Sequence, residues 1–233
     1  MSGAARSDPD IAAVAAAIGQ PARASMLSAL LVDAPLSVGE LADRGHVSPA
    51  TASLHLARLA QTGLVVGHRS GRTHCYRLAG VEVAQALEAL QRLAEPASVR
   101  SLADATAARQ IRFARSCYDH LAGELGVAVT DALVGRGYLQ AGADAFSLTP
   151  TGEQWLASLG IDVSGLRAAR RGFALYCLDW SERRPHLAGA VGAALLGRCL
   201  DAGWVSRRRA TRSLSLTTAG ALAFERELGL EMH

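Results

Sequence analysis

Two short segments of this 233-residue chain carry cysteine together with residues that bind or orient metal ions. The first is C-Y-D-H, Cys117 to His120, and the second is C-L-D-W, Cys177 to Trp180, with His186 further on. Thiolate sulfur and imidazole nitrogen are ligands that zinc and other thiophilic ions prefer. A neighbouring aspartate can orient a histidine or accept a hydrogen bond from a ligand. The candidate effector or metal site therefore consists of Cys117, Asp119, His120, Cys177, Asp179 and His186.

The same residues allow other interpretations. Cysteine is a small hydrophobic residue that is often buried, so Cys117 and Cys177 can simply pack in a core. The aspartates can form salt bridges with arginines such as Arg115 or Arg183. Cys117 could also act as a nucleophile or react with an electrophile, with His120 as its base. Because no oxyanion site or third catalytic residue is evident, we do not expect an enzyme.

A diverged internal repeat positions these segments. The run H-L-A-G-E-L-G-V-A-V-T-D-A-L-V-G-R-G-Y-L matches H-L-A-G-A-V-G-A-A-L-L-G-R-C-L-D-A-G-W-V without a gap, so that His120 pairs with His186. Each copy predicts a helix, a glycine stop, two strands and a further helix capped by Thr149 or Thr217. A helical pattern before the first copy predicts that Cys117 and His120 share one helix face. Duplication predicts packing with pseudo-twofold symmetry, which would bring the cysteines and histidines together.

Residues 37–78 predict a helix, a turn, a second helix and a basic β-hairpin. S-V-G-E is a capping box at the first helix start, and Ser48 with Pro49 begins the second helix. That helix stops at Gly63, and two short strands then flank a tip at residues 70–72. This order is that of a winged helix-turn-helix, in which the second helix enters the DNA major groove and the hairpin lies against phosphates.

The second helix and the hairpin carry side chains suited to DNA. The predicted contacts are Ser48, Thr51, Ser53, Leu54, His55, Arg58, Arg69, Arg72 and His74. Polar helix residues can read base edges, Leu54 can contact a thymine methyl, and the hairpin residues can contact phosphates. A second arginine-rich hairpin near Arg207 is either a solvated face or an auxiliary phosphate contact.

The run L-A-D-R-G-H-V-S-P-A-T-A-S-L-H-L-A-R-L-A-Q-T-G-L-V-V-G-H-R-S-G-R-T-H-C-Y-R-L resembles the ArsR/SmtB family of bacterial repressors. The preceding G-Q-P-A-R-A-S-M-L-S-A-L-L is similar to that family's helix before the motif, and the resemblance covers roughly residues 10–95. Leu54 and Ala57 depart from it, because family members often carry polar or basic side chains there. The resemblance implies a homodimeric repressor that leaves its operator, a double-stranded DNA site, when an effector binds.

Residues 81–93 predict a helix. The resemblance implies that this helix pairs with the same helix of a second subunit in a twofold dimer; packing within one subunit is the alternative. Metal-sensing family members carry ligands on the first helix of the motif or along this final helix. The corresponding segments here, E-L-A-D-R-G and V-E-V-A-Q-A-L-E-A-L-Q-R-L, lack them. The region beginning R-S-C-Y-D-H-L-A-G resembles an extension found in a longer subset of these regulators. We therefore expect sensing in the C-terminal half or at its seam with the DNA-binding domain.

Length and composition suit two compact domains. Half of the residues are hydrophobic and 19% are charged, and the net charge of +3 is too small to indicate nucleic-acid binding by itself. The start of the chain has no signal-peptide core, and no apolar run approaches the roughly 20 residues that span a bilayer. We expect a cytoplasmic protein with no membrane partner. The dispersed cysteines, in a reducing compartment, do not favour a disulfide framework.

The predicted fold class is mainly α with small β-hairpins (α+β): an N-terminal winged helix-turn-helix and a C-terminal domain of two winged-helix-like repeats. We expect residues 1–95 to form the DNA-binding and dimerisation domain, 96–112 to connect the domains, and 113–233 to form the effector domain, with repeats at about 113–160 and 173–229. The predicted function is a DNA-binding repressor released by an effector. No residue pattern specifies a cofactor, and a thiophilic metal ion or a small molecule is the candidate effector. A constitutive architectural DNA binder is the alternative.

Overall fold

The computed structural model describes residues 8–32, 34–71, 73–95, 101–208 and 211–231. Its internal contacts define two compact units, Met1–Leu87 and Glu88–His233. In the described residues both units consist of helices with short antiparallel hairpins. This agrees with the expected mixture of helices and small hairpins. Among those residues, no helix combines the length and apolar character needed to cross a membrane.

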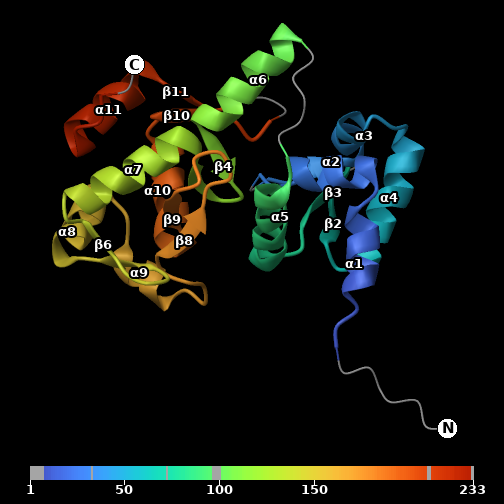
Figure 1. Ribbon diagram of the computed structural model, residues 1–233, viewed down its shortest axis with the longest axis horizontal. Helices are drawn as coiled ribbons and strands as arrows, with labels where there is room; N and C mark the ends of the chain where they lie inside the picture. The colour runs from blue at the N-terminus through green and yellow to red at the C-terminus, as the bar shows by residue number, and fades with distance from the viewer. Residues whose placement is uncertain (1–7, 33, 72, 96–100, 209–210, 232–233) are drawn as a thin grey trace. The chain divides into compact units, whose positions relative to one another are not determined.

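The first unit is a winged helix-turn-helix (Figure 1). Its elements are α1 (Ile11–Ile18), α2 (Pro21–Ala29), β1 (Leu36–Ser37), α3 (Val38–Gly45), α4 (Pro49–Gln61), β2 (Val65–Ser70), β3 (Thr73–Leu78) and the start of α5 (Val81–Leu93). The strands form one antiparallel sheet in the order β1-β3-β2. Helices α2, α3 and α4 pack on one another, and α4 also packs against β2.

Local signals in the sequence define the two helices of the motif. At α3, the Ser37 side chain accepts a hydrogen bond from the Glu40 N–H and the Glu40 carboxylate accepts one from the Ser37 N–H, which is the predicted capping box. Ser48 caps α4 by accepting a hydrogen bond from the Thr51 N–H, with Pro49 in the first helical position. Beyond α4, Gly63 adopts a left-handed φ of 71°, which releases the chain into the hairpin.

The second unit contains the succession of helix, hairpin, helix, hairpin and helix twice, and the last helix, hairpin and helix of each set are the predicted ones. Its first set is α6 (Leu102–Phe113), β4 (Arg115–Cys117), β5 (His120–Ala122), α7 (Gly123–Gly135), β6 (Leu139–Ala141), β7 (Phe146–Leu148) and α8 (Pro150–Ser158). The second set is α9 (Val163–Ala168), β8 (Leu175–Leu178), β9 (Pro185–Ala188), α10 (Gly189–Asp201), β10 (Val205–Arg207), β11 (Leu214–Leu216) and α11 (Thr218–Leu228). Thr149 and Thr217 cap α8 and α11 as expected.

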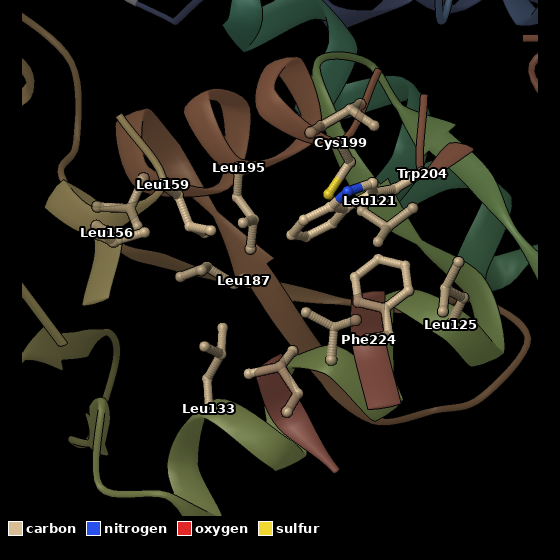
Figure 2. Close-up of a cluster of buried hydrophobic side chains, with 14 of the residues drawn as sticks. Leu121, Leu125, Leu133, Leu156, Leu159, Leu187, Leu195, Cys199, Trp204 and Phe224 are labelled. Atoms are coloured by element: carbon tan, nitrogen blue, oxygen red, sulfur yellow. The ribbon is translucent and has the colours of Figure 1, made fainter. Parts of the chain in front are cut away.

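The two sets pack on one another reciprocally: α7 lies against β9, and α10 lies against β5. A single hydrophobic core draws on both, including Leu125 and Leu133 from α7, Leu195 from α10, and Phe224 from α11 (Figure 2). Thr130 on α7 accepts a hydrogen bond from the Leu187 N–H on β9 at 2.9 Å. A pseudo-twofold arrangement requires such reciprocal contacts between the helix of one set and the hairpin of the other. That the two sets arose by duplication stays a prediction.

The structure corrects the expected helix at Cys117 and His120. Helix α6 ends at Phe113, and the chain then forms the β4–β5 hairpin, in which Cys117 and His120 are directly opposed across the two strands. Tyr118, in the two-residue turn between them, has a left-handed φ of 57°. The residues therefore lie close together, as predicted, but through a hairpin and not through helical spacing.

Candidate nucleic-acid interface and cysteine–histidine cluster

Helix α4 has one face in the core and one face in solvent. Its buried residues are Ala52, Leu56 and Leu59. On the opposite side Ser53 and Arg58 are exposed, and 74% of Leu54 is exposed. An exposed leucine side chain is not stabilised by packing within one subunit. This face of the helix is therefore free to contact another surface, such as a DNA groove.

The small hydroxyl residues of α4 are held by local hydrogen bonds. The Ser48 and Thr51 hydroxyls lie 2.9 Å apart, and Ser48 also caps the helix. The Ser53 hydroxyl donates to the Pro49 carbonyl at 2.9 Å. Each hydroxyl oxygen can still accept a further hydrogen bond. Because these contacts fix the side chains, the hydroxyl groups already have defined positions at the exposed N-terminal end of the helix before DNA binds.

Arg23, on α2, is a positioning residue that sequence reasoning missed. Its guanidinium donates to the carbonyls of Ala17 and Ala16 at 2.5 and 2.8 Å, and Nη1 lies 3.4 Å from His55 Nδ1. Because arginine is always a donor, Nδ1 of His55 is the acceptor in this contact. Arg23 thus ties the end of α1 to the candidate recognition helix, a long-range contact with no local sequence signal.

The β2–β3 hairpin forms an exposed wing. Arg69 and His74 are opposed in its register, and both are exposed. The His74 ring lies 4.8 Å from the Tyr76 ring, centroid to centroid, which limits its orientations. Arg72, at the tip, lies outside the described residues. The wing therefore presents cationic and imidazole side chains to solvent, as a phosphate contact requires.

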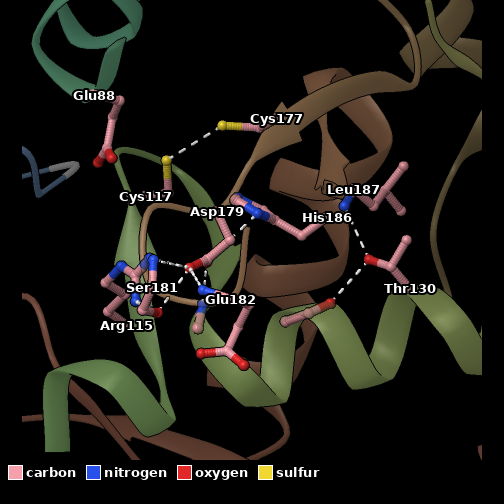
Figure 3. A network of polar contacts seen from close by, with 12 residues as sticks. Glu88, Arg115, Cys117, Thr130, Cys177, Asp179, Ser181, Glu182, His186 and Leu187 are labelled. Atoms are coloured by element: carbon pink, nitrogen blue, oxygen red, sulfur yellow. Dashed lines mark hydrogen bonds and ion pairs between the residues drawn. The ribbon is translucent and has the colours of Figure 1, made fainter. Parts of the chain in front are cut away.

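The second unit brings together the four predicted sulfur and imidazole residues. Cys117, His120, Cys177 and His186 each offer one ligand atom, and these atoms all lie within 4.8 Å of one another. The Cys117 and Cys177 sulfurs are 3.7 Å apart (Figure 3). Cys177 and His186 are opposed across β8 and β9, just as Cys117 and His120 are across β4 and β5. Each hairpin thus supplies one cysteine and one histidine.

The cluster shifts the protonation of its members. The pKa of Cys177 is lowered because the Cys117 thiol donates to its sulfur, which outweighs burial, and both imidazoles reinforce the effect. The Cys177 contact, with burial, raises the pKa of Cys117. Burial alone would lower the pKa of His120, but Asp119 and Cys177 raise it to about 9. The arrangement therefore favours the thiolate form of Cys177, the form in which cysteine binds metals and electrophiles.

The two aspartates lie behind the histidines. His120 Nδ1 donates to Asp119 at 3.2 Å, and Arg171 donates to the other oxygen of that carboxylate at 2.7 Å. Asp179 Oδ2 is 3.6 Å from His186 Nδ1. Arg115, an alternative partner considered from the sequence, donates to Asp179 Oδ1 at 2.7 Å (Figure 3).

Comparison with known proteins relates the whole chain to regulators. A helix-turn-helix domain family model matches residues 18–68. The uncharacterised HTH-type transcriptional regulator YdfF of Bacillus subtilis is 39% identical over 225 residues, which cover 97% of this chain and 100% of that protein.

The chain belongs to the ArsR family of helix-turn-helix transcriptional regulators.

Shorter relatives match part of this ArsR-family regulator. The transcriptional activator HlyU of Vibrio cholerae is 42% identical over 64 residues, covering 28% of this chain and 59% of HlyU. The solution structure of the homodimeric winged helix-turn-helix domain of Mb0332 from Mycobacterium bovis, a possible ArsR-family regulator, is 26% identical, with a TM-score of 0.36. It covers 43% of this chain and 100% of that domain.

This ArsR-family regulator is a DNA-binding protein and not an enzyme, because its relatives are transcriptional regulators. The nucleophile–base interpretation of Cys117 and His120 is therefore set aside. In the arginine-rich C-terminal hairpin, Arg207 and Arg208 are exposed. Arg212 is buried and paired with the Glu88 carboxylate. It is consequently a structural residue and cannot contribute to a phosphate contact.

Proposed function

We propose that this ArsR-family regulator is a homodimeric repressor that binds operator DNA through α4 and the wing and dissociates when its second unit binds an effector. The exposed face of α4 is the observation that carries this proposal. It combines hydroxyl, imidazole, guanidinium and aliphatic groups, which suit base edges and a thymine methyl. Ser48, Thr51 and Ser53 lie at its N-terminal end, and His55 and Arg58 lie one to two turns further along.

The proposal of a homodimer is based on exposed apolar side chains in the second half of α5. Leu90 is 46% exposed and Leu93 is 84% exposed, although the periodicity of α5 is that of an amphipathic helix. Burial of such side chains against a second copy would remove apolar surface from water at about 25 cal/mol per Å². A twofold dimer then places its recognition helices at half-sites about one helical turn apart.

The second unit is the proposed effector domain because the cysteine–histidine cluster lies there. Helices α3 and α5 lack the paired ligands expected of sensors that use those helices. An effector that favours one dimer geometry would change operator affinity by the difference between its affinities for the two geometries, typically 1–3 kcal/mol. A shift in the spacing of the recognition helices would suffice, since both half-sites must be contacted together.

Operator binding by the purified full-length protein tests the proposal. The operator is first found by selecting bound fragments from DNA of the source genome, and the affinity is then measured by fluorescence anisotropy. We expect His55→Ala with Arg58→Ala to reduce affinity for the operator to that for random DNA, with the dimer intact by light scattering. Arg226→Ala, which removes an exposed arginine on α11, is the control and should bind normally.

If the double variant still binds the operator more tightly than random DNA, α4 is not the helix that recognises the base sequence. Transcription from the operator in a reporter strain decides the sign of regulation, and a repressor requires expression to rise when the protein is removed. An affinity unchanged across metals, thiol oxidants and a metabolite panel would instead support a constitutive architectural binder.

A further inference from the structure

The histidines of the cysteine–histidine cluster have buried ring nitrogens that lack partners. Within the described residues, His120 Nε2 and both ring nitrogens of His186 have no atom that meets hydrogen-bond criteria. His120 is 7% exposed and His186 is 1% exposed, so water does not readily replace the missing partners. A buried polar group without a partner costs about 1–3 kcal/mol. Such atoms, facing two sulfurs, indicate a ligand that accepts electron pairs.

We infer that the second unit binds one thiophilic metal ion of the zinc class through Cys117, His120, Cys177 and His186. This Cys₂His₂ set has the composition of closed tetrahedral zinc sites. The inference goes beyond the proposed function, because the site holds an ion whether or not that ion alters DNA affinity.

The spacing of the sulfurs agrees with a tetrahedral site. Two thiolates at zinc–sulfur distances of about 2.3 Å and the tetrahedral angle are about 3.8 Å apart. The Cys117 and Cys177 sulfurs are 3.7 Å apart. The other edges of such a site are about 3.3–3.6 Å, so a pair of ligand atoms at up to 4.8 Å closes by at most about 1.2–1.5 Å when the ion binds. Small rotations of the side chains achieve this.

The aspartates supply the outer partners that metal-bound histidines require. Because His120 Nδ1 donates to Asp119, His120 Nε2 points away from that carboxylate and can bind a metal once it has lost its proton. Arg171 holds Asp119 from the other side. On the second hairpin Asp179 lies 3.6 Å from His186 Nδ1, which leaves Nε2 as the ligand atom. Each hairpin therefore supplies cysteine, histidine and an orienting carboxylate.

A disulfide between the cysteines is a weaker interpretation of the same cluster. It would use the two sulfurs, but it would leave the buried Nε2 atoms of His120 and His186 without a hydrogen-bond partner. The metal accounts for all four groups, and it joins β4–β5 to β8–β9 across the two sets of elements. As the ion binds, protons leave the Cys117 thiol and His120 Nε2, so binding releases protons to solvent.

Metal content and cobalt spectroscopy of the full-length protein test the site. After dialysis against a chelator and reloading with Zn²⁺, elemental analysis should give one ion per chain. Co²⁺ in its place should give the strong visible bands of a tetrahedral site and a thiolate charge-transfer band. Cys177→Ser and His186→Gln should each weaken zinc binding at least 100-fold. Cys199→Ser, which changes a buried thiol outside the cluster, should still bind one ion.

Several results would overturn the inference: less than stoichiometric metal in the reduced wild-type protein, octahedral cobalt bands, or unchanged affinity in both ligand variants. A mass two hydrogens lower, without metal, would replace it with a disulfide pair. Should the variants not fold, the wild-type cobalt spectrum alone decides. Operator affinity of the metal-free and loaded samples is measured in parallel. A stoichiometric ion with unchanged affinity upholds the site and removes the ion as the effector.

Discussion

The buried ion pair between Arg115 and Asp179 should be the most sensitive electrostatic contact in the second unit. The two side chains are 1% and 0% exposed, and the Arg115 guanidinium also lies 4.4 Å from the centre of the Trp180 ring. Asp179 accepts further hydrogen bonds from the Gly123 N–H at 2.7 Å and from the Ser181 N–H at 2.8 Å. Burial alone would raise the pKa of Asp179, but Arg115 and these donors outweigh it and hold that pKa well below its ordinary value.

Arg115→Met keeps most of the aliphatic volume and removes the charge. Breaking one partner of a buried pair costs about 3–5 kcal/mol, since the other charge remains in a site of low polarity. Asp179 keeps its backbone donors, which places the expected loss at the lower end, about 3 kcal/mol. With a urea m value of about 2 kcal/mol/M, the unfolding midpoint should fall by about 1.5 M.

Tryptophan fluorescence is the assay, because all three tryptophans lie in the second unit. Urea unfolding is followed with a chelator present, so that metal content is equal in every sample. Arg184→Met is the matched control, since it breaks an ion pair with Asp131 whose side chains are 59% and 46% exposed. Exposed pairs contribute about 0–1 kcal/mol. If the two variants unfold at similar urea concentrations, the reasoning from burial is refuted.

The remaining predictions concern the wing and the core. Arg69→Ala should weaken binding to all DNA sequences and lower the salt slope of binding by about one unit; an unchanged slope would show that the wing does not contact phosphate. Gly220→Ala should lower the free energy of unfolding by about 1–3 kcal/mol, because a Cβ there collides with the Trp204 carbonyl. Gly197→Ala, where a Cβ meets nothing within 4 Å, should instead stabilise α10 by about 0.5–1 kcal/mol, and equal effects of the two changes would contradict this.

The winged helix-turn-helix could be predicted from the sequence because its signals are local. The capping box at Ser37, the Ser48–Pro49 start and the left-handed Gly63 each act within a few residues of where they stand. The contact of Arg23 with His55 joins residues 32 positions apart and leaves no such trace. Propensities and caps could locate α4, the candidate recognition helix, but they could not reveal that Arg23 contacts it.

The sequence by itself also determined which residues gather in the second unit, because two copies of one pattern repeat the cysteine, aspartate and histidine. It did not determine how they meet. The helical pattern before Cys117 ends at Phe113, and the hairpin beyond it satisfies its backbone by pairing across strands. The tertiary structure showed that the Cys117 and Cys177 sulfurs meet through two hairpins, and it selected Arg115 as the ion-pair partner of Asp179. Such contacts depend on two distant segments packing around one core, and that packing is decided by the whole unit rather than by local preference.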